Sequence, residues 1–505
     1  MIARGDWWAP YYNGQPFFDK PMLFHQLQGI AMLAVGQNEL GARLVPAVAA
    51  LGVIAITFLF ATAMTERAVG IVASLLMASN IGVFALARYA ILDTLFTMFT
   101  FGGAAALTVA ALGDRRRLQW VGYIAIALGV LTKGPLALVL CGLTLLIAAA
   151  LSADARRRLL GLNWIAGLAV VIVLAAPWFV YMYARFGQAF VDGYLLDENI
   201  RLFASNRFAN QPGAFFYVRI LATGMLPWTG LLAGRLIDDI RAVVPGERLD
   251  TLEILLWSWT AAVVGFFSLS TFKLDHYVFP AAPALCILCA RAWNDLRTGD
   301  HRRHLASRIG VQLVGPFLVA AGLFVMYLLT TRLDLPRGAL LVPSTLMLCG
   351  VAMGLFLQMR DVHPARVPWL VTIAMIVTYG GVIAFVVPTI EGRKVVADLG
   401  RWTSSHAQAA DRIATFRLNR WNPSFRFYVD RQATFLDDAD EAAAFFAAPQ
   451  PFYCAMLRDG YDALVSKGVP LMVVYERAGI WATSGRALWR ESGDSARFVV
   501  VAPRR

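Results

Sequence analysis

The sequence carries little charge for its length. Only 15% of its 505 residues are Asp, Glu, Lys or Arg, and 58% are hydrophobic, whereas soluble domains are about one quarter charged. This composition excludes an ordinary soluble globular protein and predicts a membrane protein. Cysteine is also scarce. Four of the five cysteines fall within apolar runs and Cys454 stands alone, so no disulfide framework is predicted.

Long apolar runs recur along most of the chain. Crossing about 30 Å of hydrocarbon takes roughly 17 to 25 apolar residues, and about twelve runs approach that length. They predict membrane helices at 44–64, 68–86, 91–112, 118–132, 135–151, 163–184, 214–233, 252–271, 276–292, 309–330, 338–358 and 367–388.

Basic residues are distributed unevenly among the loops between these runs. Alternate loops hold clusters such as Arg115–Arg117 and Arg156–Arg158, roughly twice the basic content of the other short loops, and such loops lie inside. Residues 1–40, 185–212 and both termini are therefore expected on the outer face of the membrane. This topology explains the net charge of +12. No basic stripe interleaved with aromatics accompanies the clusters, which argues against a nucleic-acid partner.

The character of the chain changes after Pro388. Residues 389–505 are polar, with strand-like runs and helical patterns that alternate. The predicted strands are 412–418, 425–429, 471–475 and 497–501, and the predicted helices are 439–447 and 459–467. The expected fold is an all-α polytopic membrane protein of about 12 transmembrane helices over residues 1–388, followed by a small α/β domain outside the membrane.

Charged residues close to membrane segments are costly and mark candidate sites. On the predicted outer face they are Asp19, Lys20, Arg88, Asp93, Lys133, Asp192, Asp197, Glu198, Arg201, Arg207, Lys273 and Asp275, with His276 and Tyr277 beside them. Cations among carboxylates at lipid depth suit a substrate with a phosphate on a lipid tail, because cations stabilise a leaving phosphate. A carboxylate can take a proton from an acceptor hydroxyl. The pattern predicts glycosyl transfer.

Several of these residues also have a structural interpretation. Arg88 and Asp93 could form an ion pair at a helix end, and the Lys133 side chain could extend along apolar surface to the interface. Asp197 and Glu198 could be first-turn acids of an amphipathic helix on the membrane.

For the whole chain, a transporter or lipid flippase is the alternative from another class of function. A catalytically dead relative of a transferase is the third.

The segment RGDWWAPYYNGQPFFDKPMLFHQLQ (residues 4–28) resembles the first external loop of the polyprenyl-phosphate-dependent glycosyltransferases of the C-type fold. It is most similar to the branch containing the aminoarabinose transferase that modifies lipid A and the protein O-mannosyltransferases. The family loop reads G-D-W-x-x-P-x-x-N-G-x-x-x-F-x-K-P, and the matching residues are Gly5, Asp6, Trp7, Pro10, Asn13, Gly14, Phe18, Lys20 and Pro21. The resemblance continues in ELGARLVPA, ARYAILDT, LTKGP, ENIRLF, LPWT and FKLDHYVFPAAPAL.

The resemblance implies that Lys20 contacts the donor phosphate, that Asp93 is an acid at the mouth of the active site, and that Tyr277 approaches the phosphate. With the charge pattern, it gives the expected site. Lys20 and Asp93 are the expected catalytic residues; the donor phosphate is expected on Lys20, Arg88, Arg201, Lys273 and Tyr277; and the substrate-site loop is expected to contain Phe18, Asp19 and Glu198. The expected partners are a polyprenyl-phosphate-linked sugar, membrane lipids and a lipid A-like or other periplasmic acceptor.

Two features depart from the family pattern. Family members carry a membrane helix and an acidic motif, with the expected base, before the G-D-W segment at which this chain begins. We therefore expect the reading frame to continue upstream by roughly 40 to 70 residues, enough for one span, and we expect Asp6 to cap a turn rather than replace that base. Asn210 stands where the family often has a histidine, so a divalent-metal pair with Asp19 is not predicted.

Overall fold

In a computed structural model of the chain, the described residues are 1–113, 115–201, 212–244, 249–298, 304–331, 335–358, 366–418, 424–481 and 496–504. They divide into two compact units. Unit 1 contains Met1–Tyr11, Pro16–Leu323 and Pro343–Tyr379, and unit 2 contains Tyr12–Gln15, Phe324–Val342 and Gly380–Arg505.

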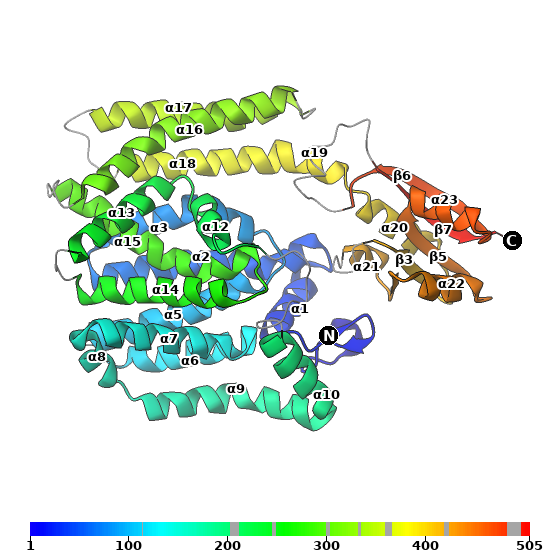
Figure 1. The fold of residues 1–505 in the computed structure, drawn as a ribbon, viewed down its shortest axis with the longest axis horizontal. Helices are drawn as coiled ribbons and strands as arrows, with labels where there is room; N and C mark the ends of the chain where they lie inside the picture. Colours follow the sequence, from blue (N-terminus) through cyan, green and yellow to red (C-terminus); the bar gives the residue numbers. More distant parts are fainter. Residues whose placement is uncertain are drawn as a thin grey trace. The chain divides into compact units, whose positions relative to one another are not determined.

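Unit 1 is built almost entirely of helices (Figure 1). Those that matter below are α1 (Leu23–Val35), α2 (Glu39–Met64), α3 (Arg67–Ser79), α4 (Ile81–Leu86), α5 (Asp93–Leu112), α6 (Leu118–Lys133), α7 (Leu136–Leu151), α9 (Trp164–Phe186), η2 (Val191–Arg201), α12 (Phe216–Gly224), α13 (Thr229–Val243), α14 (Thr251–Leu269), η3 (Asp275–Ala281), α15 (Ala282–Thr298) and α16 (Leu305–Thr331). Two further apolar helices follow, α17 (Leu341–Gln358) and α18 (Arg366–Gly381).

Seven described helices are long and apolar enough to cross a membrane. They are Glu39–Met64, Asp93–Leu112, Trp164–Phe186, Thr251–Leu269, Leu305–Thr331, Arg337–Leu357 and Arg366–Gly392. The chain is therefore a multi-pass membrane protein, as the composition predicted. The expected spans 118–132 and 135–151 are the shorter helices α6 and α7, of 16 residues each.

Several of the twelve predicted spans are broken or begin as a turn in the structure. The run 68–86 divides at Asn80, whose side chain accepts a hydrogen bond from the Val83 amide and so starts α4. The run 214–233 divides into α12 and α13, and the run 276–292 begins as the 3₁₀ turn η3 before α15. Local capping and turn geometry interrupt these runs although their hydropathy is continuous.

Small residues let neighbouring helices of unit 1 approach closely. A Cβ atom on Gly103 of α5 would lie 3.0 Å from the carbonyl oxygen of Gly122 on α6, and one on Gly315 of α16 would lie 2.9 Å from that of Gly350 on α17. Such contacts are typical of helix packing in membranes. Figure 1 shows α5, α6 and α7 running alongside one another. This packing brings the end of α6 back to the beginning of α5.

A cluster of buried charged residues connects the helices α13, α14, α15 and α16. We call it the Arg235 cluster, and it consists of Arg235, Asp238, Asp239, Glu253 and Arg291. Arg235 is 1% exposed, and its guanidinium donates to Asp239 at 2.8 Å and to Glu253 at 2.5 Å. Arg291 of α15 pairs with Glu253 at 3.5 Å. Asp238 accepts two backbone hydrogen bonds at the beginning of α16, from Ala306 and Ser307.

Unit 2 contains a five-stranded sheet in the order β4-β3-β5-β7-β6. The strands are β3 (Arg412–Phe416), β4 (Thr434–Leu436), β5 (Phe452–Leu457), β6 (Leu471–Gly479) and β7 (Ala496–Pro503). β3 is parallel to β4 and β5, and β7 is antiparallel to β5 and β6. Apolar residues of α22 (Ala439–Ala447) and α23 (Arg458–Ser466) pack on one face, and those of α20 (Val396–His406) and α21 (Ser424–Val429) pack on the other. The predicted small α/β domain is confirmed.

One predicted strand is wrong. Residues 425–429 form the helix α21, in which Phe425 and Val429 are the buried residues. Their spacing of four places both on one face of a helix. The alternation in FRFYV suggested a strand because aromatic and β-branched residues favour strands. The predicted strands at 412–418, 471–475 and 497–501 and both predicted helices are confirmed.

We predict that Arg235→Met strongly destabilises unit 1. It leaves the buried carboxylates of Asp239 and Glu253 without their central cation, and breaking a buried pair typically costs about 3 to 5 kcal/mol. The thermal unfolding midpoint of the purified full chain in detergent measures the effect. Arg158→Ala, which removes an exposed pair with Asp154, is the control and should leave the midpoint unchanged. Equal midpoints for the two variants would contradict the prediction.

Candidate active site

A pocket of about 780 Å³ lies within unit 1. It is lined by Lys20, Lys133, Pro135, Leu136, Val139, Glu198, Phe266, Phe267, Ser270, Phe272 and Tyr277, and we call it the Lys20–Lys133 pocket. Its walls come from the first loop, the junction of α6 and α7, η2, the end of α14 and η3. Most of the lining is apolar, and among the described lining residues the two lysines are the only cations. The pocket therefore offers a hydrocarbon surface next to positive charge.

Lys133 is held by the carboxylate of Asp93. The Lys133 Nζ lies 2.5 Å from Asp93 Oδ1, and their side chains are only 7% and 4% exposed. The ring of Tyr277 faces the same ammonium, whose Nζ lies 4.4 Å from the ring centroid. The second Asp93 oxygen lies 3.5 Å from His276 Nε2. Asp93 thus pairs with Lys133 and His276, and the proposed ion pair with Arg88 is not among the contacts of the described residues.

Lys20 reaches the pocket from the first loop. Its Nζ lies 3.3 Å from Glu198 Oε2 and donates to the backbone carbonyl of Asp19 at 2.7 Å. Glu198 belongs to η2, a π-helix, so the acids of this segment are not in the first turn of an α-helix. The first loop and η2 are far apart in sequence, and this contact brings them to one pocket.

Gly134 makes the close approach of η2 to the α6–α7 junction possible. Its φ is +80°, a conformation that favours glycine. A Cβ atom there would collide with the hydroxyl of Tyr194 on η2, a residue that is 1% exposed. The absence of a side chain at Gly134 therefore sets how closely η2 covers Lys133.

The other predicted site residues lie outside the lining of this pocket. Arg88 faces the ring of Phe84 at 5.6 Å, and Arg201 pairs with Asp197 at 2.7 Å on the exposed side of η2. Lys273 donates to the carbonyl of Ser270, which is a lining residue. Phe18 packs edge-on against Phe186 and Phe190.

Asp6 caps a turn, as predicted. Its Oδ1 accepts hydrogen bonds from the amides of Trp8 and Ala9, each at 3.1 Å, and its Oδ2 lies 2.7 Å from Arg185. Burial raises the pKa of the Asp6 carboxyl, but the bonds from Ala9, Arg185 and Trp8 outweigh burial and lower it overall. The carboxylate is fully engaged in holding the first loop.

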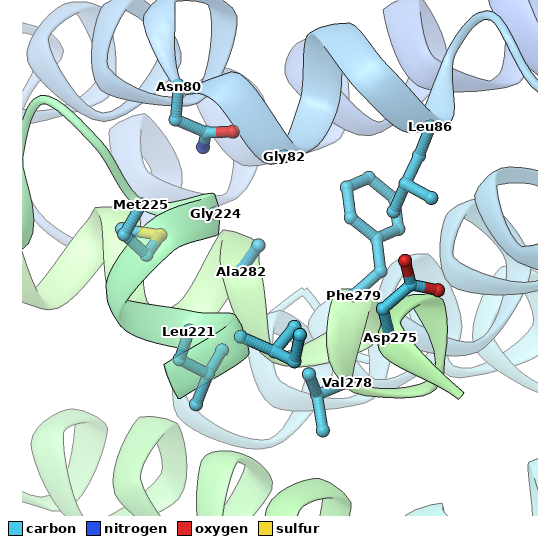
Figure 2. Close-up of a pocket in the computed structure, with 11 residues that line it drawn as sticks. Asn80, Gly82, Leu86, Leu221, Gly224, Met225, Asp275, Val278, Phe279 and Ala282 are labelled. Carbon is cyan, nitrogen blue, oxygen red and sulfur yellow. The ribbon is translucent and has the colours of Figure 1, made fainter. Parts of the chain in front are cut away.

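A second, smaller opening of about 350 Å³ lies between α4, α12 and the beginning of α15. Figure 2 shows mainly apolar side chains around it, including Leu86, Met225 and Phe279, with Asp275 at its edge. Asp275 and Tyr277 are two residues apart on η3 and line different openings. The turn η3 therefore separates the two.

The residues fit no metal centre in the part of the chain that the structure describes. No group of three or more His, Cys, Asp or Glu side chains there is arranged to hold an ion. Asn210 lies outside the described residues, as does Arg207.

Comparison with known proteins agrees with this geometry. Residues 2–190 match the family model of the dolichyl-phosphate-mannose-protein mannosyltransferases. An undecaprenyl phosphate-alpha-4-amino-4-deoxy-L-arabinose arabinosyl transferase of Sodalis glossinidius is 29% identical over 298 residues, which is 57% of this chain and 52% of that protein. The corresponding transferase of Pseudomonas aeruginosa strain UCBPP-PA14 is 30% identical over 59% of this chain and 54% of its own length. The chain thus matches about half the length of these curated relatives.

The crystal structure of ArnT from Cupriavidus metallidurans bound to undecaprenyl phosphate has the same fold. The TM-score is 0.76 at 21% identity, covering 99% of this chain and 91% of that one. The chain is thus similar in sequence to transferases named for an undecaprenyl phosphate-linked sugar, and it shares its fold with ArnT. The resemblance of the first loop is thereby confirmed.

Sequence reasoning named Lys133 and His276 but gave neither a place in the site. A usable signal was present. The loop between α5 and α6 is short, so the two helices are antiparallel neighbours. The first residue of α5, Asp93, and the last of α6, Lys133, must then lie at the same end.

We predict that Asp93 and Lys133 are energetically coupled. Asp93→Asn and Lys133→Met should each lower the thermal midpoint, because each leaves a buried charge without its partner. The double variant should lose less stability than the sum of the losses of the two single variants, and the difference, which is the coupling energy, should be about 1 to 3 kcal/mol. The more exposed pair Glu391 and Lys394, changed to Gln and Met, is the control cycle and should be additive. Additive losses at Asp93 and Lys133 would refute the coupling.

Proposed function

We propose that this chain transfers a sugar from a polyprenyl-phosphate carrier to an acceptor on the periplasmic side of a bacterial inner membrane. The observation that carries the proposal is the Lys20–Lys133 pocket, which places two ammonium groups beside an apolar wall in a homologue of enzymes that use such donors. A polyprenyl chain needs apolar surface, and its phosphate needs cations. The pocket offers both.

The reaction breaks the bond between the anomeric carbon of the sugar and a phosphate oxygen, and forms a bond from that carbon to an acceptor oxygen. The acceptor hydroxyl gives up its proton to a carboxylate base, and the leaving phosphate keeps the bonding electron pair. Cations placed where this charge develops lower the barrier. Lys20 and Lys133 are positioned for that role, and the Tyr277 hydroxyl is the neutral donor proposed beside them.

In this proposal Asp93 contributes to transfer indirectly, by positioning Lys133. Its carboxylate holds Lys133 at 2.5 Å, which fixes the ammonium at the pocket wall. Arg88, Arg201 and Lys273 remain proposed donor-phosphate residues, and Phe18, Asp19 and Glu198 remain proposed residues of the substrate-site loop. The names of the relatives make 4-amino-4-deoxy-L-arabinose the first sugar to test. The resemblance of the first loop makes a lipid A-like molecule the first acceptor to test.

We expect Lys20→Ala to lower the transfer rate by about a hundredfold or more, because losing a charged partner of the leaving phosphate typically costs about 2 to 4 kcal/mol in the transition state. The assay uses the full-length gene product in proteoliposomes with undecaprenyl phosphate-linked aminoarabinose and lipid A. Lys467→Ala, at an exposed position of unit 2, is the control. Wild-type turnover in the Lys20 variant would show that Lys20 takes no part in transfer and serves only as an anchor at the membrane interface.

The proposed orientation has its own test. A reporter enzyme that works only outside the cytoplasm, fused after Arg505, should be active, because the alternation of basic loops puts residues 389–505 in the periplasm. A second reporter that works only in the cytoplasm should be silent at the same position. A silent first reporter and an active second reporter would mean that the number of membrane crossings differs by one from the predicted number.

A further inference from the structure

His276 lies between two carboxylates at the edge of the Lys20–Lys133 pocket. It is the second residue of η3 and its side chain is 19% exposed. Its Nε2 lies 3.5 Å from Asp93 Oδ2, and its Nδ1 lies 3.1 Å from Asp275 Oδ1. The Asp275 oxygen also accepts from the backbone amide of His276 at 2.9 Å. Each ring nitrogen therefore faces an acceptor.

Two carboxylates facing the two ring nitrogens suit a doubly protonated ring. A neutral imidazole has one N–H, so one nitrogen would turn its lone pair toward a carboxylate oxygen. Only the doubly protonated ring donates to both neighbours. The hydrogen bond from His276 is the main reason that the pKa of the Asp275 carboxyl is lowered, against the effect of burial.

The same charge balance involves the ammonium in the pocket. Asp93 offers one negative charge, with Lys133 on Oδ1 and His276 on Oδ2. With a charged His276, the two cations Lys133 and His276 balance the two carboxylates Asp93 and Asp275. With a neutral ring, the same four groups carry one net negative charge, which opposes an anion in the pocket.

The surroundings of η3 add few other charges. Among the described residues, the titratable groups around this part of η3 are Asp93 from α5, Lys133 from α6, Glu198 from η2, Tyr217 from α12, and Asp275 and Tyr277 from η3. The helix α4 carries no charged residue. Glu253 of α14 and Arg291 of α15 belong to the Arg235 cluster.

We propose that His276 is a positioning residue of the site, whose charged ring clamps Asp93 from the side opposite Lys133 and leaves the Lys133 ammonium available to an anionic lipid phosphate in the pocket. The inference rests on the proposed function for the identity of that anion. It assigns His276 a task through Asp93 and Lys133 and gives it no contact with the reacting atoms.

The test measures binding of undecaprenyl phosphate to the full chain in nanodiscs, at about pH 5.5 and about pH 8.5, a range that spans the charge change of an ordinary histidine. The variants are His276→Gln, which keeps a neutral donor, and His406→Gln, which changes an exposed histidine of α20 as the control. Ionisation of the lipid phosphate affects binding to the variants and to the wild type alike. The ratio of variant to wild-type affinity at each pH therefore isolates the effect of the His276 ring.

We expect His276→Gln to weaken binding about tenfold at the lower pH, the usual scale for losing one charge-assisted hydrogen bond, and about twofold or less at the higher pH. His406→Gln should match the wild type at both. An equal loss at both pH values would show a merely structural role, and no loss at either would also overturn the inference.

Transfer of the sugar, measured on the same samples, separates this inference from the proposed function. A wild-type protein that shows the expected binding ratios but transfers no sugar would overturn the proposed function and leave the role of His276 standing. A wild-type protein that does not bind undecaprenyl phosphate at either pH would overturn both. Melting midpoints confirm that each variant is folded before the comparison is made.

Discussion

The buried ion pair between Asp93 and Lys133 is the interaction on which the site depends. It joins the beginning of α5 to the end of α6, two antiparallel helices that pack through glycine contacts. An unpaired charge at this depth would be expensive, so neither residue can be changed alone without disturbing the other. The ammonium is thereby fixed at the junction with α7, where the wall of the pocket begins.

Charge is concentrated in two places in the helical unit, and each has a different consequence. In the Arg235 cluster, acidic and basic groups of α13, α14 and α15 pair with one another, and removing one partner would leave a buried charge. Around Asp93, one carboxylate contacts Lys133 and His276, and apolar pocket surface lies beside the Lys133 ammonium. An ammonium at an apolar pocket wall is a feature that a packing element does not need, and a phosphate can bind it.

Much of this organisation could be predicted from the sequence. Long apolar runs predicted the helices because hydropathy is a strong signal over twenty residues, and the first loop predicted the family. The breaks at Asn80 and before α13 could not be predicted, because one capping side chain or turn outweighs a long apolar context. The pairing of Asp93 with Lys133 rather than Arg88 was missed for a related reason: Arg88 is closer in sequence, but helix packing decides which cation is closer in space. FRFYV was misassigned because a five-residue stretch is too short for its period to be certain.

Gly134 limits the genetic variation that this site can accept. Every substitution of a glycine adds a Cβ atom, and at this position that atom would take the space of the Tyr194 hydroxyl. No single-nucleotide missense change in the codon is therefore structurally silent, however conservative the new side chain. A compensating change at Tyr194 would have to come first, so we expect natural variants to alter the two positions together.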